Sequence, residues 1–104
     1  MVNNISVKQL KERIDAKTII LIDVRERFEL EICKIKGSIN IKMEDIPNTI
    51  DKMDKNQEYA IICHSGTRSF NISFFLVNRG FSAYNVIGGI DAWAKEIDHL
   101  MDTY

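Results

Sequence analysis

The sequence predicts an α/β fold, an open and mostly parallel sheet of about five strands with helices on both faces. Strand-like and helix-like segments alternate along the 104 residues. Two strand candidates, 18–23 and 58–63, are almost wholly apolar, which is typical of strands that are covered on both faces in a parallel sheet. The length suits one domain, residues 1–104.

The first half of the chain carries clear start and stop signals. A helix begins at Ser6, because Ser6 and Gln9 have the spacing of a capping box. Farther on, Pro47 is compatible with a helix only in its first turn, since proline lacks a backbone N–H. The predicted elements of this half are a helix over 5–15, a strand over 18–23, a short charged helix over 25–32, a short strand over 37–42 and a helix over 43–53.

The second half continues the alternation. A strand over 58–63 leads into a helix over 67–80, which Gly80 is placed to end. Apolar residues nearly encircle this helix, so we expect it to pack deeply, with the phenylalanines of 70–75 in the core. The remaining elements are a strand over 82–87 and a helix over 88–101, with Trp93 as a core anchor.

Composition excludes several classes of partner. The net charge of −1 gives no concentrated cationic face for nucleic acid or for an anionic membrane surface. The N-terminal residues lack the pattern of a signal peptide, and no apolar run could span a bilayer. Two cysteines in a well-cored chain indicate a reducing compartment, so we expect a cytoplasmic protein. No cofactor motif is present, and Cys63, His64 and His99 lack the ligand spacing of a zinc site.

The segment CHSGTRS, residues 63–69, is the candidate active site. It places Cys63 between a strand and a helix N-terminus, where backbone N–H groups favour negative charge. Gly66 lets the loop turn its amides inward, and Arg68 adds a permanent positive charge. No acidic residue lies between 58 and 91, so no carboxylate in that segment opposes a lowered Cys63 pKa. Small hydroxyls that can donate to an anion are those of Ser65, Thr67 and Ser69.

The loop chemistry alone does not determine which group, if any, Cys63 carries. The same cradle would stabilise a persulfide or a thiophosphoryl group on Cys63, and the simplest alternative is an inert buried thiol. His64 either tunes the local charge or points to water. Either one of Asp23 and Arg25 lines the donor pocket or, as we favour, the two form a salt bridge or hydrogen bonds that anchor the loop. Cys33 is either a resolving thiol for Cys63 or, as we favour, a bystander.

Four motifs in order resemble the single-domain rhodanese-type sulfurtransferases over nearly the whole chain. The active-site loop is CHSGTRS, and the other motifs are DVRE at 23–26, KIKGSINI at 34–41 and GGIDAW at 88–93. The third segment departs from the family pattern, because Cys33, Lys34 and Lys36 replace the usual glycine, histidine and proline. This departure leaves the thiol loop itself intact.

The resemblance implies a function and a set of site residues. Cys63 would take sulfane sulfur from a donor such as thiosulfate and hold it as a persulfide, then pass it to cyanide or to a thiol, in some cases a protein thiol. Such covalent catalysis gives ping-pong kinetics. Arg68 would orient the donor and hold the loop. The residues whose backbone amides would cradle the sulfur are His64, Ser65, Gly66, Thr67 and Arg68.

Loop length favours sulfur over phosphate. Phosphatases related by fold carry arginine six positions after the cysteine, whereas Arg68 here comes five positions after Cys63. The smaller ring suits one sulfur atom better than a tetrahedral phosphate. A phosphatase is therefore the minor alternative, and a sulfur-carrying or regulatory module without turnover is the alternative of another class.

Overall fold

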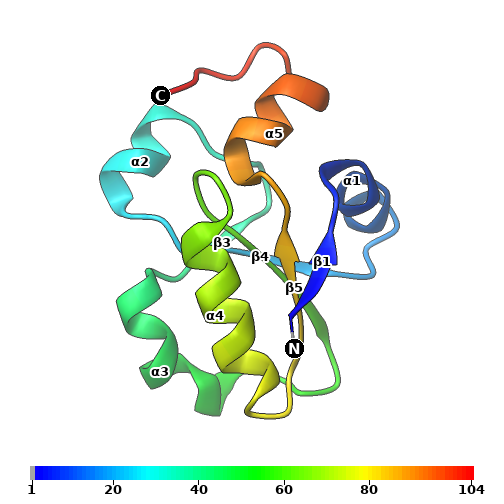
Figure 1. The fold of residues 1–104 in the computed structure, drawn as a ribbon, viewed down its shortest axis with the longest axis vertical. Helices are drawn as coiled ribbons and strands as arrows, with labels where there is room; N and C mark the ends of the chain where they lie inside the picture. The colour runs from blue at the N-terminus through cyan, green and yellow to red at the C-terminus, as the bar shows by residue number, and fades with distance from the viewer. Residues whose placement is uncertain (1) are drawn as a thin grey trace.

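The computed structural model describes residues 2–104 and contains one five-stranded sheet (Figure 1). The strands follow the order β1-β5-β4-β2-β3, and every pairing between neighbours is parallel. This arrangement confirms the predicted fold class. The strands are β1 (Asn3–Ile5), β2 (Ile20–Asp23), β3 (Ile39–Asn40), β4 (Glu58–Ile62) and β5 (Ser82–Val86).

Helices alternate with the strands and cover both sides of the sheet, as the sequence predicted. The α-helices are α1 (Val7–Asp15), α2 (Arg27–Ile32), α3 (Ile46–Thr49), α4 (Thr67–Val77) and α5 (Gly89–Glu96). None of the helices within residues 2–104 is long and apolar enough to cross a membrane.

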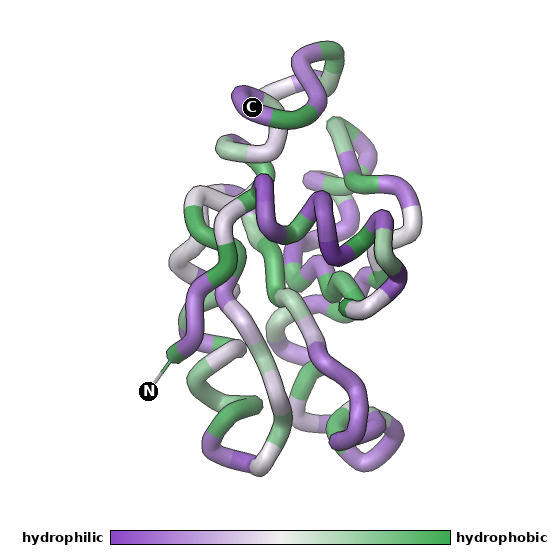
Figure 2. The backbone as a smooth tube through the Cα atoms, turned by 90° about the vertical axis from the view of Figure 1, so that its right-hand side faces the viewer, coloured by the Kyte–Doolittle hydropathy of each residue, from purple (hydrophilic) through white to green (hydrophobic). Residues whose placement is uncertain are grey.

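The sheet separates two hydrophobic clusters, because successive strand residues point to opposite faces. Along β4, Ala60 and Ile62 belong to the cluster beneath α1 and α5. Ile61 and Cys63 belong to the cluster beneath α3 and α4. Hydrophobic and hydrophilic residues alternate along the helices (Figure 2). Helices α1 and α5 place buried hydrophobic residues in the first of these clusters, and α3 and α4 do so in the second. The sulfur of Cys63 therefore lies on the α4 side of the sheet.

Strand β1 was not predicted. Its three residues pair with β5 through Asn3, Asn4 and Ile5, at one edge of the sheet. Two asparagines have low strand propensity, so the pairing depends on the partner strand rather than on local preference. The Ser6 capping box does follow directly, with the Gln9 N–H donating to Ser6 Oγ at 3.1 Å.

Helix α4 ends as Gly80 predicted, but its outer face is more exposed than expected. Gly80 has φ +89, and the Phe81 N–H donates to the Leu76 carbonyl at 3.1 Å in a Schellman pattern. Phe70 and Phe74 are 45% and 48% exposed, so the prediction that both are core residues is wrong. The apolar residues encircle the helix, yet only one side of it meets the sheet.

Two other predicted helices are shorter or interrupted. The segment 43–53 consists of two 3-10 turns, Met43–Asp45 and Ile50–Lys52, around the four-residue α3. Pro47 lies at the start of α3, where its missing N–H costs no helix hydrogen bond. Helix α5 ends at Glu96 rather than at 101, because Asp98 forms a turn and accepts the Leu100 N–H at 3.1 Å.

Packing of α4 on the sheet can be tested with a matched pair of substitutions. Leu76→Ala removes a fully buried side chain and should lower the free energy of unfolding by about 2–5 kcal/mol. Phe74→Ala, on the half-exposed side of the same helix, should cost about 1 kcal/mol or less. Urea denaturation followed by circular dichroism measures both. Equal losses in the two variants would contradict this account of the packing.

Candidate active site

Cys63 directly follows β4, the central strand, and precedes the amino end of α4 (Figure 1). The residue is only 1% exposed. Its Sγ accepts the Gly66 N–H at 3.1 Å and the Ser69 N–H at 3.4 Å, and it lies 3.2 Å from Ser69 Oγ. Three polar groups from the start of α4 thus converge on the sulfur. The two N–H groups would stabilise negative charge on it.

Gly66 makes this convergence possible. It has φ +113, a left-handed conformation that glycine adopts without a steric cost, and it is the N-cap of α4. The turn at Gly66 brings its own N–H back onto the sulfur. The amides that reach Cys63 Sγ are thus those of Gly66 and Ser69. The cradle expected at residues 64–68 concerns the transferred sulfur and stays a prediction.

The first turn of α5 holds the loop from the other side. The Ile90 N–H donates to the Cys63 carbonyl at 2.9 Å, and the Asp91 N–H donates to the His64 carbonyl at 3.1 Å. A Cβ at Gly89 would lie 2.5 Å from the Cys63 oxygen, so the loop packs directly on glycine backbone. The motif that the sequence singled out at 88–93 therefore supports the thiol loop.

A carboxylate from α2 also reaches the loop. Glu29 accepts both Arg68 Nη1 at 2.7 Å and Arg68 Nη2 at 2.8 Å, a bidentate pair. These bonds lower the pKa of Glu29 to about 2 and raise the pKa of Arg68. The sequence excluded an opposing carboxylate only between residues 58 and 91, and Glu29 lies outside that segment. The charge of Arg68 is balanced by a residue 39 positions away.

Tyr104 completes this ion pair. Its hydroxyl donates to Glu29 Oε2 at 2.7 Å and accepts from Arg25 Nη1 at 2.9 Å. Burial raises the pKa of Tyr104 to about 12, so the hydroxyl stays protonated. The Tyr104 ring also stacks on His64, with the ring centroids 3.8 Å apart. Residues that follow α5 thus return to α2, as Figure 1 shows, and Tyr104 contacts the loop at His64.

Asp23 and Arg25 form a fully buried ion pair. Arg25 Nη2 donates to Asp23 Oδ2 at 2.8 Å, and neither side chain is exposed. Burial alone would lower the pKa of Arg25, but the bonds from Asp23 and Tyr104 raise it overall. Arg25 also donates to the Cys33 carbonyl at 2.8 Å. This pair ties the end of β2 to the segment after α2, and neither residue lines the open pocket beside Arg68.

The other predicted loop residues occupy varied positions. Ser65 and Thr67 are exposed. His64 is partly buried, and its Nε2 lies 3.0 Å from Asp91 Oδ1. The hydroxyl beside the sulfur belongs instead to Ser69, which is fully buried and donates to Asn85 Oδ1 at 2.6 Å. Asn85 was not predicted, although an asparagine inside the apolar strand 82–87 is a signal that could have been used.

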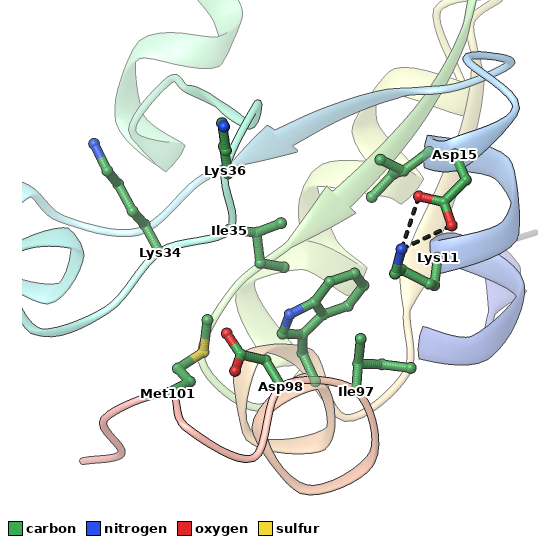
Figure 3. A pocket seen from close by; sticks show the side chains of 10 residues that line it. Lys11, Asp15, Lys34, Ile35, Lys36, Ile97, Asp98 and Met101 are labelled. Atoms are coloured by element: carbon green, nitrogen blue, oxygen red, sulfur yellow. Dashed lines mark hydrogen bonds and ion pairs between the residues drawn. The ribbon is translucent and has the colours of Figure 1, made fainter.

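Two pockets of similar volume differ in whether they adjoin the thiol loop. A pocket of about 550 Å³ opens beside Arg68. Its other lining residues are Val24, Glu26, Met43, Glu44, Pro47 and Ile72. A second pocket, of about 510 Å³, lies among α1, α5 and the segment 34–36 (Figure 3). Lys11 and Asp15 pair on its α1 side, and no residue of the thiol loop lines it.

Neither a metal site nor a disulfide accompanies the thiol in residues 2–104. No three His, Cys, Asp or Glu side chains of that range gather as a candidate metal site. Cys33 and Cys63 are both free thiols. Cys33 packs against the cluster on the α1 side of the sheet, whereas Cys63 belongs to the cluster on the α4 side.

This fold and site define a class: a parallel α/β protein with a cysteine loop shaped to hold negative charge on sulfur. The family model of the rhodanese-like domain matches residues 6–96. The chain therefore belongs to the rhodanese-like domain family.

Individual relatives agree with this family. The chain is 43% identical over 96 residues to "Putative sulfurtransferase YtwF" of Bacillus subtilis, covering 91% of this chain and 93% of that one. It is 29% identical over 91 residues to "Thiosulfate sulfurtransferase GlpE" of Shewanella oneidensis, covering 86% and 90%. The crystal structure of a rhodanese-related protein from Thermoplasma volcanium superimposes with a TM-score of 0.85 at 35% identity, covering 91% and 93%. These relatives place the chain among the sulfurtransferases as a class.

The Glu29–Arg68 pair predicts a dependence of stability on pH. The pKa of Glu29 is depressed from 4.5 to about 2 in the folded chain, so its contribution is complete above 4.5 and is lost as the pH falls towards 2. Over that range the unfolding free energy of the wild type should fall by about 3 kcal/mol more than that of Glu29→Gln. Urea denaturation at several pH values measures the difference. Glu44→Gln, at an exposed surface pair, should behave as the wild type does.

The contact between Gly89 and the loop predicts a selective effect on the thiol. Gly89→Ala introduces a Cβ that collides with the Cys63 and His64 carbonyls at a position with φ +57, so the loop must shift. A displacement of about 1 Å should change the alkylation rate of Cys63 by iodoacetamide roughly tenfold or more. Gly37→Ala is the control, since it has φ +88 and open space around its Cβ. The prediction fails if both variants react at the wild-type rate.

Proposed function

We propose that this protein transfers sulfane sulfur from a small donor such as thiosulfate to a thiol acceptor, through a persulfide on Cys63. The observation that carries the proposal is the convergence of two amides and one hydroxyl on Cys63 Sγ. This cradle accommodates negative charge on one sulfur atom. The names of the relatives, which include a thiosulfate sulfurtransferase, support the same chemistry.

The first half-reaction loads the sulfur. The Cys63 thiolate attacks the outer sulfur of thiosulfate, a new S–S bond forms, and the original S–S bond breaks. Sulfite leaves with the electron pair of that bond. The terminal sulfur of the persulfide is then the anion, and the backbone amides of residues 64–68 at the start of α4 would cradle it.

The second half-reaction unloads the sulfur. A nucleophile, cyanide in an assay or a small-molecule or protein thiol in the cell, attacks the terminal sulfur. The bond to Cys63 breaks, and the thiolate leaves with the electron pair, ready for another donor. The chemistry requires no metal or cofactor, because the cysteine itself carries the transferred atom.

Arg68 has two roles in this proposal. Its bidentate pair with Glu29 fixes the loop, and it also lines the pocket of about 550 Å³ beside the loop. An anionic donor in that pocket would meet a guanidinium whose charge is partly balanced. His64, Ser65 and Thr67 provide loop backbone, while Asp23 and Arg25 hold the end of β2. Cys33 has no role in the transfer.

Kinetics with thiosulfate and cyanide test the proposal. Wild-type protein should form thiocyanate with ping-pong kinetics, and Cys63→Ser should abolish it. Intact mass spectrometry after thiosulfate treatment should show one added sulfur atom on the wild type and none on Cys63→Ser. Cys33→Ser is the matched control and should retain both sulfur loading and transfer.

Three outcomes would contradict the proposal. Sulfur transfer by Cys63→Ser would remove the persulfide from the mechanism. Hydrolysis of an aryl phosphate without thiocyanate formation would favour a phosphatase. Sulfur loading without turnover, across several thiol acceptors, would favour a carrier or regulatory module.

A further inference from the structure

A chain of polar side chains connects the Cys63 sulfur to the edge of the sheet. Ser69 Oγ lies 3.2 Å from Cys63 Sγ and donates to Asn85 Oδ1 at 2.6 Å. Asn85 Nδ2 then donates to Asn4 Oδ1 at 3.4 Å. Ser69 and Asn85 are buried, whereas Asn4 is exposed on β1. The proposed persulfide chemistry uses the Ser69 hydroxyl but gives no role to either asparagine.

The Ser69 hydroxyl has one proton, so it can donate to only one of its two neighbours at a time. While Ser69 donates to Asn85, it has no proton left for the sulfur. The 3.2 Å contact is then a hydrogen bond only if the Cys63 thiol donates to Ser69 Oγ. This orientation of the amide therefore belongs to the neutral thiol.

When the sulfur is ionised, the opposite orientation of the Asn85 amide is favoured. When Cys63 loses its proton to solvent, Sγ can only accept, so the Ser69 hydroxyl must turn towards it. Ser69 Oγ and Asn85 Oδ1 would then face each other as two acceptors, which is costly in a buried site. A half-turn of the Asn85 amide replaces Oδ1 by Nδ2, and the terminal torsion of asparagine permits this turn without a change of shape.

We infer that Asn85 and Asn4 are positioning residues that turn their amides over when Cys63 becomes an anion, which frees the Ser69 hydroxyl to donate to the sulfur. Asn4 can follow the turn because it is exposed at the sheet edge, where its own amide can rotate to donate to Asn85. An amide suits this task because it presents a donor and an acceptor in the same shape. A carboxylate in place of either amide could only accept hydrogen bonds. It would therefore hold the hydrogen bonds in the arrangement that accompanies the neutral thiol.

The charged groups around Cys63 are separate from this chain. Arg68 of α4 pairs with Glu29 of α2, and His64 lies beside Asp91 of α5. The buried pair of Asp23 and Arg25 lies at the end of β2, beside β4, and Glu26 and Glu44 line the pocket beside Arg68. Substitutions at Asn4 leave all of these pairs in place, so a change in Cys63 ionisation can be assigned to the amide chain or to the added charge itself.

The test places a carboxylate at position 4, the exposed end of the hydrogen-bonded series. Asn4→Asp should slow the alkylation of Cys63 by iodoacetamide about threefold to tenfold, because the carboxylate holds the Ser69 hydroxyl away from the ionised sulfur. The rate is measured against pH by mass spectrometry of the Cys63 peptide, which separates it from Cys33. Asn3→Asp is the charge-matched control, because alternate residues of a strand point to opposite faces. Asn3 is exposed beside Asn4 and should leave the profile unchanged.

A second set of variants asks whether the effect passes through Ser69. Asn85→Asp should slow the alkylation of Cys63 about tenfold or more, since a carboxylate at position 85 can only accept from the Ser69 hydroxyl. In a Ser69→Ala background, both Asn4→Asp and Asn85→Asp should lose most of their effect. If Asn85→Asp does not fold, the pair Asn4→Asp and Asn4→Asp/Ser69→Ala gives the same comparison at an exposed position.

Any of three results would overturn the inference. If Asn4→Asp and Asn3→Asp change the pH profile of alkylation equally, the effect is due to charge alone. The same holds if the change caused by Asn4→Asp or Asn85→Asp is equal with and without the Ser69 hydroxyl. An unchanged profile in both Asn4→Asp and Asn85→Asp would remove the asparagines from the mechanism. Alkylation needs only the thiolate, so these results stand apart from the sulfur-transfer assay. The part of the inference that concerns the persulfide rests on the proposed function.

Discussion

The site depends on how the first turn of α5 holds two carbonyl groups of the thiol loop. The Cys63 and His64 carbonyls accept N–H groups of Ile90 and Asp91, and the close approach requires glycine at position 89. In a trans peptide the C=O and N–H point in opposite directions, so anchoring these carbonyls turns the following amides away from α5. The loop is therefore oriented by a helix that contributes no side chain to the sulfur.

Charge around the thiol is balanced over long distances in the sequence. Arg68 is paired with Glu29, and Glu29 in turn accepts the hydroxyl of Tyr104, 75 positions farther along. A free guanidinium next to the sulfur would bind any anion, whereas a bidentate ion pair fixes the geometry and leaves a weaker field. If the loop holds a small anionic sulfur as proposed, its selectivity would follow from shape and hydrogen bonding as much as from net charge.

Much of this arrangement could be predicted from the sequence, because its signals are local. The apolar runs gave the parallel strands, and Gly66 and Gly80 marked turns that require positive φ. Contacts between distant segments had no such signal, so Glu29, Tyr104 and the edge strand β1 were missed. The exposure of Phe74 was also missed, since apolar residues around a helix do not tell how many of its sides are covered.

The thiol follows the strand that has neighbours on both sides. In the order β1-β5-β4-β2-β3, β4 is paired on both edges and covered on both faces. Local opening of a protein begins where backbone hydrogen bonds are exposed to water, at sheet edges and chain ends. Amide protons of β4 should therefore be among the last to exchange with solvent. Cys63 thus follows the strand that we expect to stay folded the longest, so its surroundings should keep their geometry while the sheet edges open.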